Sequence, residues 1–193
     1  MADPVEILDF WLGEVGLEGW FNGGDAVDDA VRTRYLDVWQ AARDGGLEHW
    51  VDGTVGTLAY LIVTDQFPRN MFRGSPDAFA TDPQALAAAR RALDLGWDMD
   101  APEPERNFFY LPFEHSEAMD DQNLSVEIVT ARLPNHPDFA FHARAHQDVI
   151  RQFGRFPYRN AALGRTNTPD EITFLDAGGY PGLITRLREA EKG

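Results

Sequence analysis

The sequence contains no cysteine and a single lysine, Lys192, among its 193 residues. The absence of cysteine excludes disulfides, thiol nucleophiles, iron–sulfur clusters and zinc sites built on thiolates. No segment approaches the roughly 18 consecutive apolar residues that a membrane-spanning helix requires. The N-terminus has neither the basic nor the apolar region of a signal peptide. We therefore expect a cytoplasmic protein that does not bind membranes.

Basic residues are scarce as a class, since 17 lysines and arginines stand against 32 acidic residues and give a net charge of -15. Binding to duplex nucleic acid depends on lysine and arginine contacts with phosphate. The charge therefore argues against a duplex partner. A hydrophobic share of 44% is enough for a sizeable core, and the length predicts a single domain over residues 1–193.

The acidic excess is distributed unevenly along the chain. Residues 1–60 hold 12 acids and 3 arginines, whereas residues 139–168 hold one acid and five arginines. These arginines have two interpretations. They pair with carboxylates as structural ion pairs, because a guanidinium group binds a carboxylate bidentately, or they form a site for an anionic group such as phosphate or carboxylate.

The pattern of apolar residues predicts helices, and no run alternates in the way that a half-buried strand requires. Asp3-Pro4, Asp82-Pro83 and Thr168-Pro169 are typical helix starts. The segment 20–24 is expected to be a loop with two exposed aromatic residues, and the chain is expected to fray after Gly178-Gly179. We predict an all-α fold of about seven to nine helices, stacked in antiparallel pairs. The predicted helices with the clearest periodicity span residues 25–44, 54–66, 82–95, 116–133 and 137–153.

Two segments of the chain echo one another. Gln66-Phe67-Pro68-Arg69-Asn70 is similar to Arg155-Phe156-Pro157-Tyr158-Arg159-Asn160. The similarity indicates an internal duplication, with halves of roughly 1–96 and 97–180, or a coincidence of short motifs. Asp65 precedes the first segment at the predicted C-terminal end of a helix, where its charge opposes the helix dipole. It is therefore expected to pair with Arg69 or Arg73, either to close the helix end or within a cleft.

A third motif places His115, Glu117 and Asp121 at a predicted helix N-terminus with Ser116 as its N-cap. Acidic residues are stabilising there, and a general acid/base role for His115 with a neighbouring carboxylate is the alternative. His142 and His146 are four residues apart and would face a common ligand. The apolar neighbours of His146 favour a core histidine with a hydrogen-bond partner instead. We predict no metal site and no cofactor.

Five motifs together resemble a bacterial family catalogued as domain of unknown function 924, over about Asp9 to Leu175. The resemblance implies an all-α fold similar to tetratricopeptide-repeat superhelices, and it implies no activity and no catalytic residue. Such a superhelix offers a concave groove that suits ligand binding. The motifs are the segments 65–70, 79–82 and 110–117, the residues Gln122 and His146, and the segment 154–160.

The absence of any self-sufficient catalytic motif favours a binding module over an enzyme. Its ligand would be an anionic peptide, a small metabolite or a short single strand. The alternative is a hydrolase-type enzyme in which His115, Glu117, Asp65 and Asp121 supply acid/base groups and arginines hold an anionic substrate. The sequence leaves the oligomeric state open. The predicted ligand-binding residues are Trp20, Gln66, Arg69, Asn70, Arg73, Tyr110, Gln122, His146, Arg155, Arg159, Asn160 and Arg165.

Overall fold

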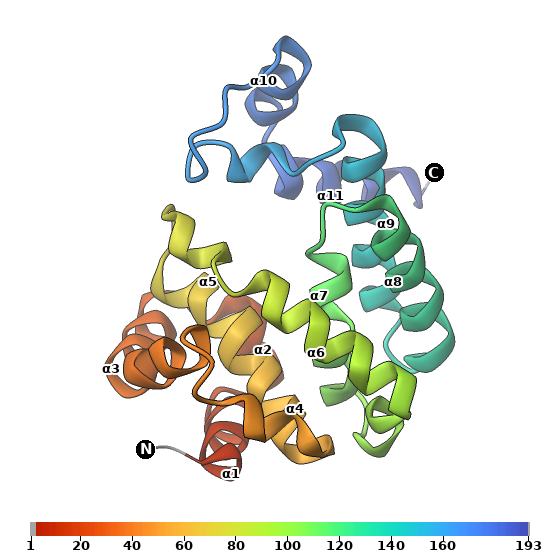
Figure 1. Cartoon of the computed structure of the whole chain (residues 1–193). Helices are drawn as coiled ribbons and strands as arrows, with labels where there is room; N and C mark the ends of the chain where they lie inside the picture. Colours follow the sequence, from red (N-terminus) through yellow and green to blue (C-terminus); the bar gives the residue numbers. More distant parts are fainter. Residues whose placement is uncertain (1–2, 193) are drawn as a thin grey trace. The chain divides into compact units, whose positions relative to one another are not determined.

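The computed structural model describes residues 3–192, and over this range the chain is helical with no strand (Figure 1). The predicted all-α fold class is therefore confirmed. The chain divides into two compact units, Met1–Phe113 and Glu114–Gly193. No helix in residues 3–192 is long and apolar enough to cross a membrane.

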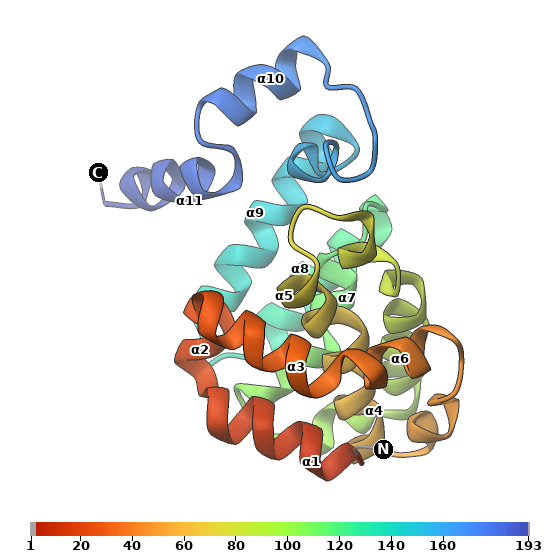
Figure 2. The same ribbon diagram turned by 90° about the vertical axis from the view of Figure 1, so that its left-hand side faces the viewer.

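The first unit begins with a helical stretch that continues further than the sequence predicts. Helix α1 (Pro4–Leu8) starts as expected, with the Asp3 carboxylate accepting a hydrogen bond from the Glu6 amide at 3.0 Å. A π-helical segment (Asp9–Val15) and helix α2 (Gly16–Asn22) follow, and Figure 2 shows this stretch leading into α3. The predicted loop at residues 20–24 is wrong, because Trp20 lies in α2 and is buried. Its neighbour Phe21 is exposed, as predicted.

Two π-helical segments occur in this unit, and each presents a backbone carbonyl to a side-chain donor. The wider turn of a π-helix disturbs the regular hydrogen-bond ladder. In the first segment the indole N–H of Trp20 donates to the Trp11 carbonyl at 2.6 Å. In the second (Ile62–Gln66), which continues helix α4 (Thr54–Leu61), the hydroxyl of Thr81 donates to the Thr64 carbonyl at 2.5 Å. Both contacts join segments that are separated along the chain.

An aromatic core holds the first unit together. The rings of Tyr35 and Phe67 stack with their centroids 5.2 Å apart, and Trp11 meets Phe67 edge-on at 5.5 Å. Such pairs add to the free energy gained by burying the rings. The remaining elements of the unit are helices α3 (Gly24–Arg43), α5 (Phe67–Met71) and α6 (Asp82–Leu95), with 3-10 turns at Glu48–Asp52, Pro76–Phe79, Trp97–Asp100 and Glu105–Phe109.

The second unit is built on a helical hairpin. Helices α8 (Met119–Arg132) and α9 (Pro137–Phe153) pack side by side (Figure 1), and a four-residue connection makes them antiparallel. The bounds of α9 agree with the prediction. Helix α8 starts later than predicted, because Ala118 rather than Ser116 is its N-cap. Helix α7 (Leu111–Glu114) spans the boundary between the units.

The end of the chain forms two helices, α10 (Pro169–Asp176) and α11 (Gly179–Ala190). Thr168 and Glu171 form a reciprocal capping box at the start of α10. The predicted fraying after Gly178-Gly179 is wrong, because these glycines adopt positive φ angles of 94° and 56° and the chain turns directly into α11. Glycine adopts this left-handed conformation at little cost.

Candidate functional site

The first echoing segment, in the unit Met1–Phe113, is held in place by a network of ion pairs around Arg69. The guanidinium of Arg69 lies 3.2 Å from the Asp65 carboxylate and 3.0 Å from that of Asp82. Asp65 is almost completely buried, and the side-chain amide of Gln66 donates to it at 2.5 Å. Asp65 thus has the predicted cationic partner, but its predicted position at a helix end is wrong, because the π-helical segment Ile62–Gln66 runs directly into α5.

Arg73 and Asn70 are held in a second network by one buried carboxylate, that of Asp28 on α3. Arg73 donates through Nε at 2.5 Å and through Nη2 at 2.9 Å, and Asn70 donates at 2.7 Å. Burial raises the pKa of Asp28, but the hydrogen bonds from Arg73 and Asn70 outweigh this effect and the pKa is lowered. The contacts of this segment therefore favour its interpretation as a set of structural ion pairs.

The two aromatic residues predicted to line a groove in this unit are buried instead. Trp20 is 8% exposed and Tyr110 is fully buried. The Tyr110 hydroxyl donates to the buried Asp98 carboxylate at 2.7 Å. Both side chains are part of the core, where an aromatic residue with a polar group requires such a partner.

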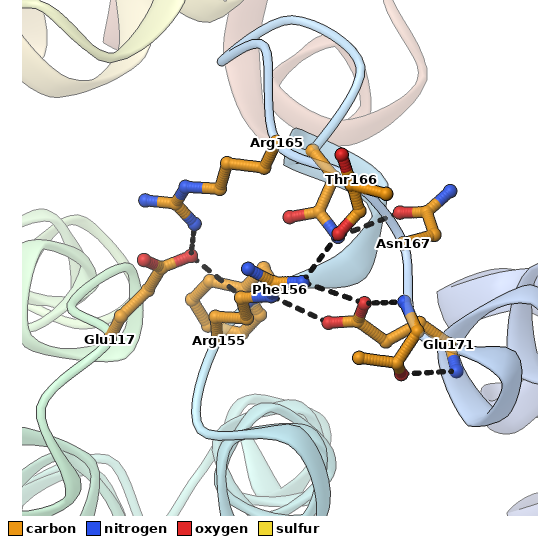
Figure 3. A network of polar contacts seen from close by, with 9 residues as sticks. Glu117, Arg155, Phe156, Arg165, Thr166, Asn167 and Glu171 are labelled. Atoms are coloured by element: carbon orange, nitrogen blue, oxygen red, sulfur yellow. Dashed lines mark hydrogen bonds and ion pairs between the residues drawn. The ribbon is translucent and has the colours of Figure 1, made fainter.

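The second echoing segment, in the unit Glu114–Gly193, belongs to a loop over residues 154–168 that is anchored by two carboxylates (Figure 3). Glu117 accepts hydrogen bonds from the Phe156 amide and from Arg165, both at 2.9 Å. Glu171 binds Arg155 bidentately, at 2.6 Å and 2.8 Å. These bonds fix the loop against the start of α8 and the start of α10.

The loop carries an excess of positive charge. Burial raises the pKa of Glu117, but Arg165 and the Phe156 amide lower it more strongly. Hydrogen bonds from Arg155 lower the pKa of Glu171 to about 2. Both carboxylates are therefore ionised near neutral pH. The charge of Arg159 also lowers the pKa of Glu117, so all three arginines of the loop lie near these carboxylates.

Three further predicted residues fix backbone segments of the same unit. The buried side chain of Asn160 donates to Asn167 at 2.7 Å. Asp121 accepts from the Ser116 hydroxyl at 2.7 Å, which places it in the first turn of α8 as a structural carboxylate. Gln122 donates to the carbonyl of Glu114 at 2.7 Å and, at the same distance, to that of Ser116.

A histidine cluster is the most chemically distinctive feature of the second unit. The carboxylate of Glu114 lies 2.8 Å from Nδ1 of His146, and both side chains are buried or nearly so. The hydroxyl of Tyr180, on α11, lies 2.9 Å from Nδ1 of His142 and 3.1 Å from Nδ1 of His146. The ring of His115 lies 6.2 Å from that of His146. The prediction that His146 has a hydrogen-bond partner is confirmed.

The surrounding atoms determine where the protons of this cluster lie. Nδ1 of His146 faces the Glu114 carboxylate and, at 3.0 Å, the carbonyl oxygen of His142. Both oxygens can accept but not donate, so we assign the hydrogen of neutral His146 to Nδ1. Tyr180 then donates its own proton to Nδ1 of His142. In this arrangement Nε2 of His146 is the basic nitrogen.

The electrostatic environment supports this assignment. Burial raises the pKa of Glu114, but His146, His115 and His142 together lower it below its ordinary value, so the carboxylate is ionised. Burial lowers the pKa of His142, which favours its neutral form. Burial also raises the pKa of Tyr180 far above its usual range, so the hydroxyl keeps its proton.

Sequence reasoning identified His115 and His146 but did not select Glu114 or Tyr180. Glu114 lies within the motif at residues 110–117, but nothing in the sequence distinguishes it from the other residues of that motif. Among residues 3–192 no group of three or more histidine, aspartate or glutamate side chains is arranged to hold a metal ion. The two echoing segments lie in different units. That they line one common groove stays a prediction.

Fold and site together define an all-α protein of two helical units, with a buried glutamate–histidine pair in the second. The family model described as "Bacterial protein of unknown function (DUF924)" matches residues 7–179, and the chain belongs to this family. The chain is similar to the solved structure of a protein of unknown function, ATU0120, from Agrobacterium tumefaciens. The two share 38% sequence identity with a TM-score of 0.84, over 89% of this chain and 96% of that chain. No curated protein matches the chain.

Proposed function

We propose that the unit Glu114–Gly193 carries an acid/base catalytic site in which His146 is the general base and Glu114 orients it. The observation that carries this proposal is the 2.8 Å hydrogen bond between the two side chains. A carboxylate bound to one ring nitrogen fixes the tautomer and the orientation of an imidazole and stabilises the cation that forms when the other nitrogen takes a proton. This changes the enzyme alternative predicted from the sequence, with His146 in place of His115 and Glu114 in place of Glu117, Asp65 and Asp121.

Hydrolysis is the reaction class that fits these groups best. The chain has no cysteine, and the Ser116 hydroxyl already donates to Asp121. Water is therefore the nucleophile that the proposal requires. Nε2 of His146 takes a proton from water while the water oxygen bonds to the substrate carbon or phosphorus, and the departing group takes that proton back.

The loop over residues 154–168 supports a substrate with an anionic group. Its ring at Phe156 lies 5.6 Å from that of His146, and Arg159 packs over Phe156 at 4.6 Å. The Phe156 ring thus links Arg159 to the base. A phosphate or carboxylate group on the substrate would be attracted there.

A binding module without chemistry is the second candidate, and the three arginines of the loop, which has no acidic residue of its own, support it. In that case the loop would retain an anionic peptide, metabolite or short strand, and the histidine cluster would serve the fold. The two candidates differ in what they require of His146. Catalysis requires its Nε2 lone pair, whereas retention of an anion by the loop does not.

A comparison of metabolite turnover in matched variants tests the proposal. The full chain is incubated with a mixture of phosphorylated and carboxylated metabolites, with and without chelator, and consumption is followed by mass spectrometry. General base catalysis contributes about 10²–10⁴-fold, so His146→Gln should lower turnover by that factor. His49→Gln, at an exposed histidine of the first unit, should leave turnover unchanged.

Equal turnover by the parent chain and His146→Gln would exclude the catalytic proposal. Ligand-induced stabilisation then tests the binding candidate, with Arg165→Gln as the variant that removes loop charge. Stabilisation by an anion that survives His146→Gln and is lost in Arg165→Gln supports a binding module. Circular dichroism confirms that each variant remains helical.

A further inference from the structure

Tyr180 occupies a position that the proposed mechanism does not yet use. It is the second residue of α11 and follows the left-handed turn at Gly178-Gly179. Its ring packs against that of His146 with centroids 4.3 Å apart. Its hydroxyl lies within hydrogen-bond distance of Nδ1 of both His142 and His146. The last helix of the chain therefore completes the histidine cluster.

The hydroxyl cannot serve both imidazoles in the same way. Nδ1 of His146 carries a hydrogen, because it faces a carboxylate and a carbonyl. The single proton of Tyr180 is therefore donated to His142, and its oxygen lone pairs face His146. Only a His142 ring without a hydrogen on Nδ1 can accept that proton. The hydroxyl thus selects the neutral tautomer of His142 that is protonated at Nε2.

We propose that Tyr180 is a positioning residue of the acid/base site, which holds His142 in this tautomer and, beside Glu114, offers its lone pairs to the hydrogen on Nδ1 of His146. The inference rests on the function proposed above. It assigns to Tyr180 and to helix α11 a part in keeping Nε2 of His146 as the basic nitrogen. Without the hydroxyl, Nδ1 of His142 is able to carry a hydrogen, and Nδ1 of His146 loses one of its acceptors.

Burial and the surrounding charges act on the protonation of His142 but not on the choice between its two ring nitrogens. Glu114, on α7, attracts a proton to His142, and Asp138, on the same helix α9, acts in the same direction. His146 on α9 and Arg188 on α11 oppose protonation. Burial is the largest effect and keeps His142 neutral. The hydroxyl of Tyr180 adds a directional preference that these effects do not supply, because it specifies one ring nitrogen.

Nitrogen NMR of the histidine rings tests the inference directly. In the full chain labelled with ¹⁵N-histidine, long-range proton–nitrogen spectra report the tautomer of each ring, and His142→Gln and His146→Gln assign the signals. We expect the parent chain to show His142 protonated at Nε2 and His146 protonated at Nδ1 when neutral. If His142 of the parent chain is instead protonated at Nδ1, the inference is overturned, and no Tyr180 variant is needed for this result.

Tyr180→Phe should convert the His142 signals to those of a mixture of tautomers. Tyr158→Phe is the matched control, because it removes a hydroxyl from a ring 6.5 Å from that of Tyr180. An unchanged His142 spectrum in Tyr180→Phe, or the same change in Tyr158→Phe, overturns the inference.

A kinetic measurement separates this inference from the proposed function. For any metabolite whose turnover requires His146, Tyr180→Phe should lower kcat and change the pH profile of kcat while leaving KM unchanged. A change confined to KM contradicts a positioning role. If turnover does not depend on His146, the proposed function fails, whereas the NMR result still decides whether Tyr180 sets the tautomer.

Discussion

Removal of the Phe156 side chain should destabilise the second unit strongly, whereas removal of its exposed neighbour should not. Phe156 is fully buried and packs with Val149, Ile150 and Phe174, whereas Tyr158 is 40% exposed. Both belong to the same 3-10 turn region of the loop over residues 154–168. Phe156→Ala and Tyr158→Ala therefore form a matched pair in which backbone context is nearly constant and burial differs.

The magnitude follows from the area of the ring. A buried aromatic side chain removes roughly 150–250 Å² from water, which at about 25 cal/mol/Å² corresponds to about 4–6 kcal/mol. Alanine retains part of that area, so the expected loss for Phe156→Ala is about 3–5 kcal/mol in the free energy of unfolding. For Tyr158→Ala we expect about 1 kcal/mol, the centre of the range for single substitutions.

Unfolding in urea, followed by two signals, measures this loss. All five tryptophans lie in the first unit, so fluorescence reports that unit, while far-ultraviolet circular dichroism reports the helices of both. Phe156→Ala should lower the urea midpoint of the circular dichroism transition well below that of Tyr158→Ala. Equal midpoints for the two variants would refute the reasoning that burial of Phe156 stabilises the loop.

Two further substitutions test contacts of single polar groups. The folded pKa of Glu171 is about 2 against an ordinary 4.5, so its stabilisation is complete above about pH 4.5 and is lost as the pH falls towards 2. Glu171→Gln should flatten the dependence of the urea midpoint on pH in that window, and an unchanged dependence contradicts the assignment. Thr81→Val leaves the Trp39 indole and the Thr64 carbonyl without their partner and should cost about 2–4 kcal/mol by fluorescence. Thr57→Val is its control, because the buried Thr57 hydroxyl has no hydrogen-bond partner within residues 3–192; an equal loss in both would exclude a hydrogen-bond effect.

Local signals in the sequence were sufficient for several helices. The bounds of α9 and the capping box at Thr168 follow from residue pattern and capping chemistry alone. The errors at residues 20–24 and at Gly178-Gly179 share a physical cause. Paired glycines indicate a break in the helix, but they do not say whether the chain continues as a loop or turns into another helix. The buried Trp20 indole donates to the Trp11 carbonyl, a contact that the residue pattern at 20–24 does not reveal.

The arginine motifs show how composition constrains a site. In a chain with nearly twice as many acids as bases, the arginines of these motifs are expected to meet carboxylates. Arg69, Arg73, Arg155 and Arg165 all do so. The sequence therefore predicted the type of partner but not its identity. Asp28 lies 45 residues before its partner Arg73, and Glu171 lies 16 residues after its partner Arg155.

The buried pair of Glu114 and His146 is difficult to explain by stability alone. Burying the ionised Glu114 carboxylate costs free energy that apolar residues of similar volume would not cost. What the pair provides instead is a fixed tautomer with a basic Nε2. Tyr180 and His142 extend the same arrangement, because the Tyr180 hydroxyl donates to Nδ1 of His142 while Nδ1 of His146 faces acceptors only. A cluster that fixes the protons on these two Nδ1 atoms is suited to proton transfer, and this property distinguishes it from the ion pairs of the arginine motifs.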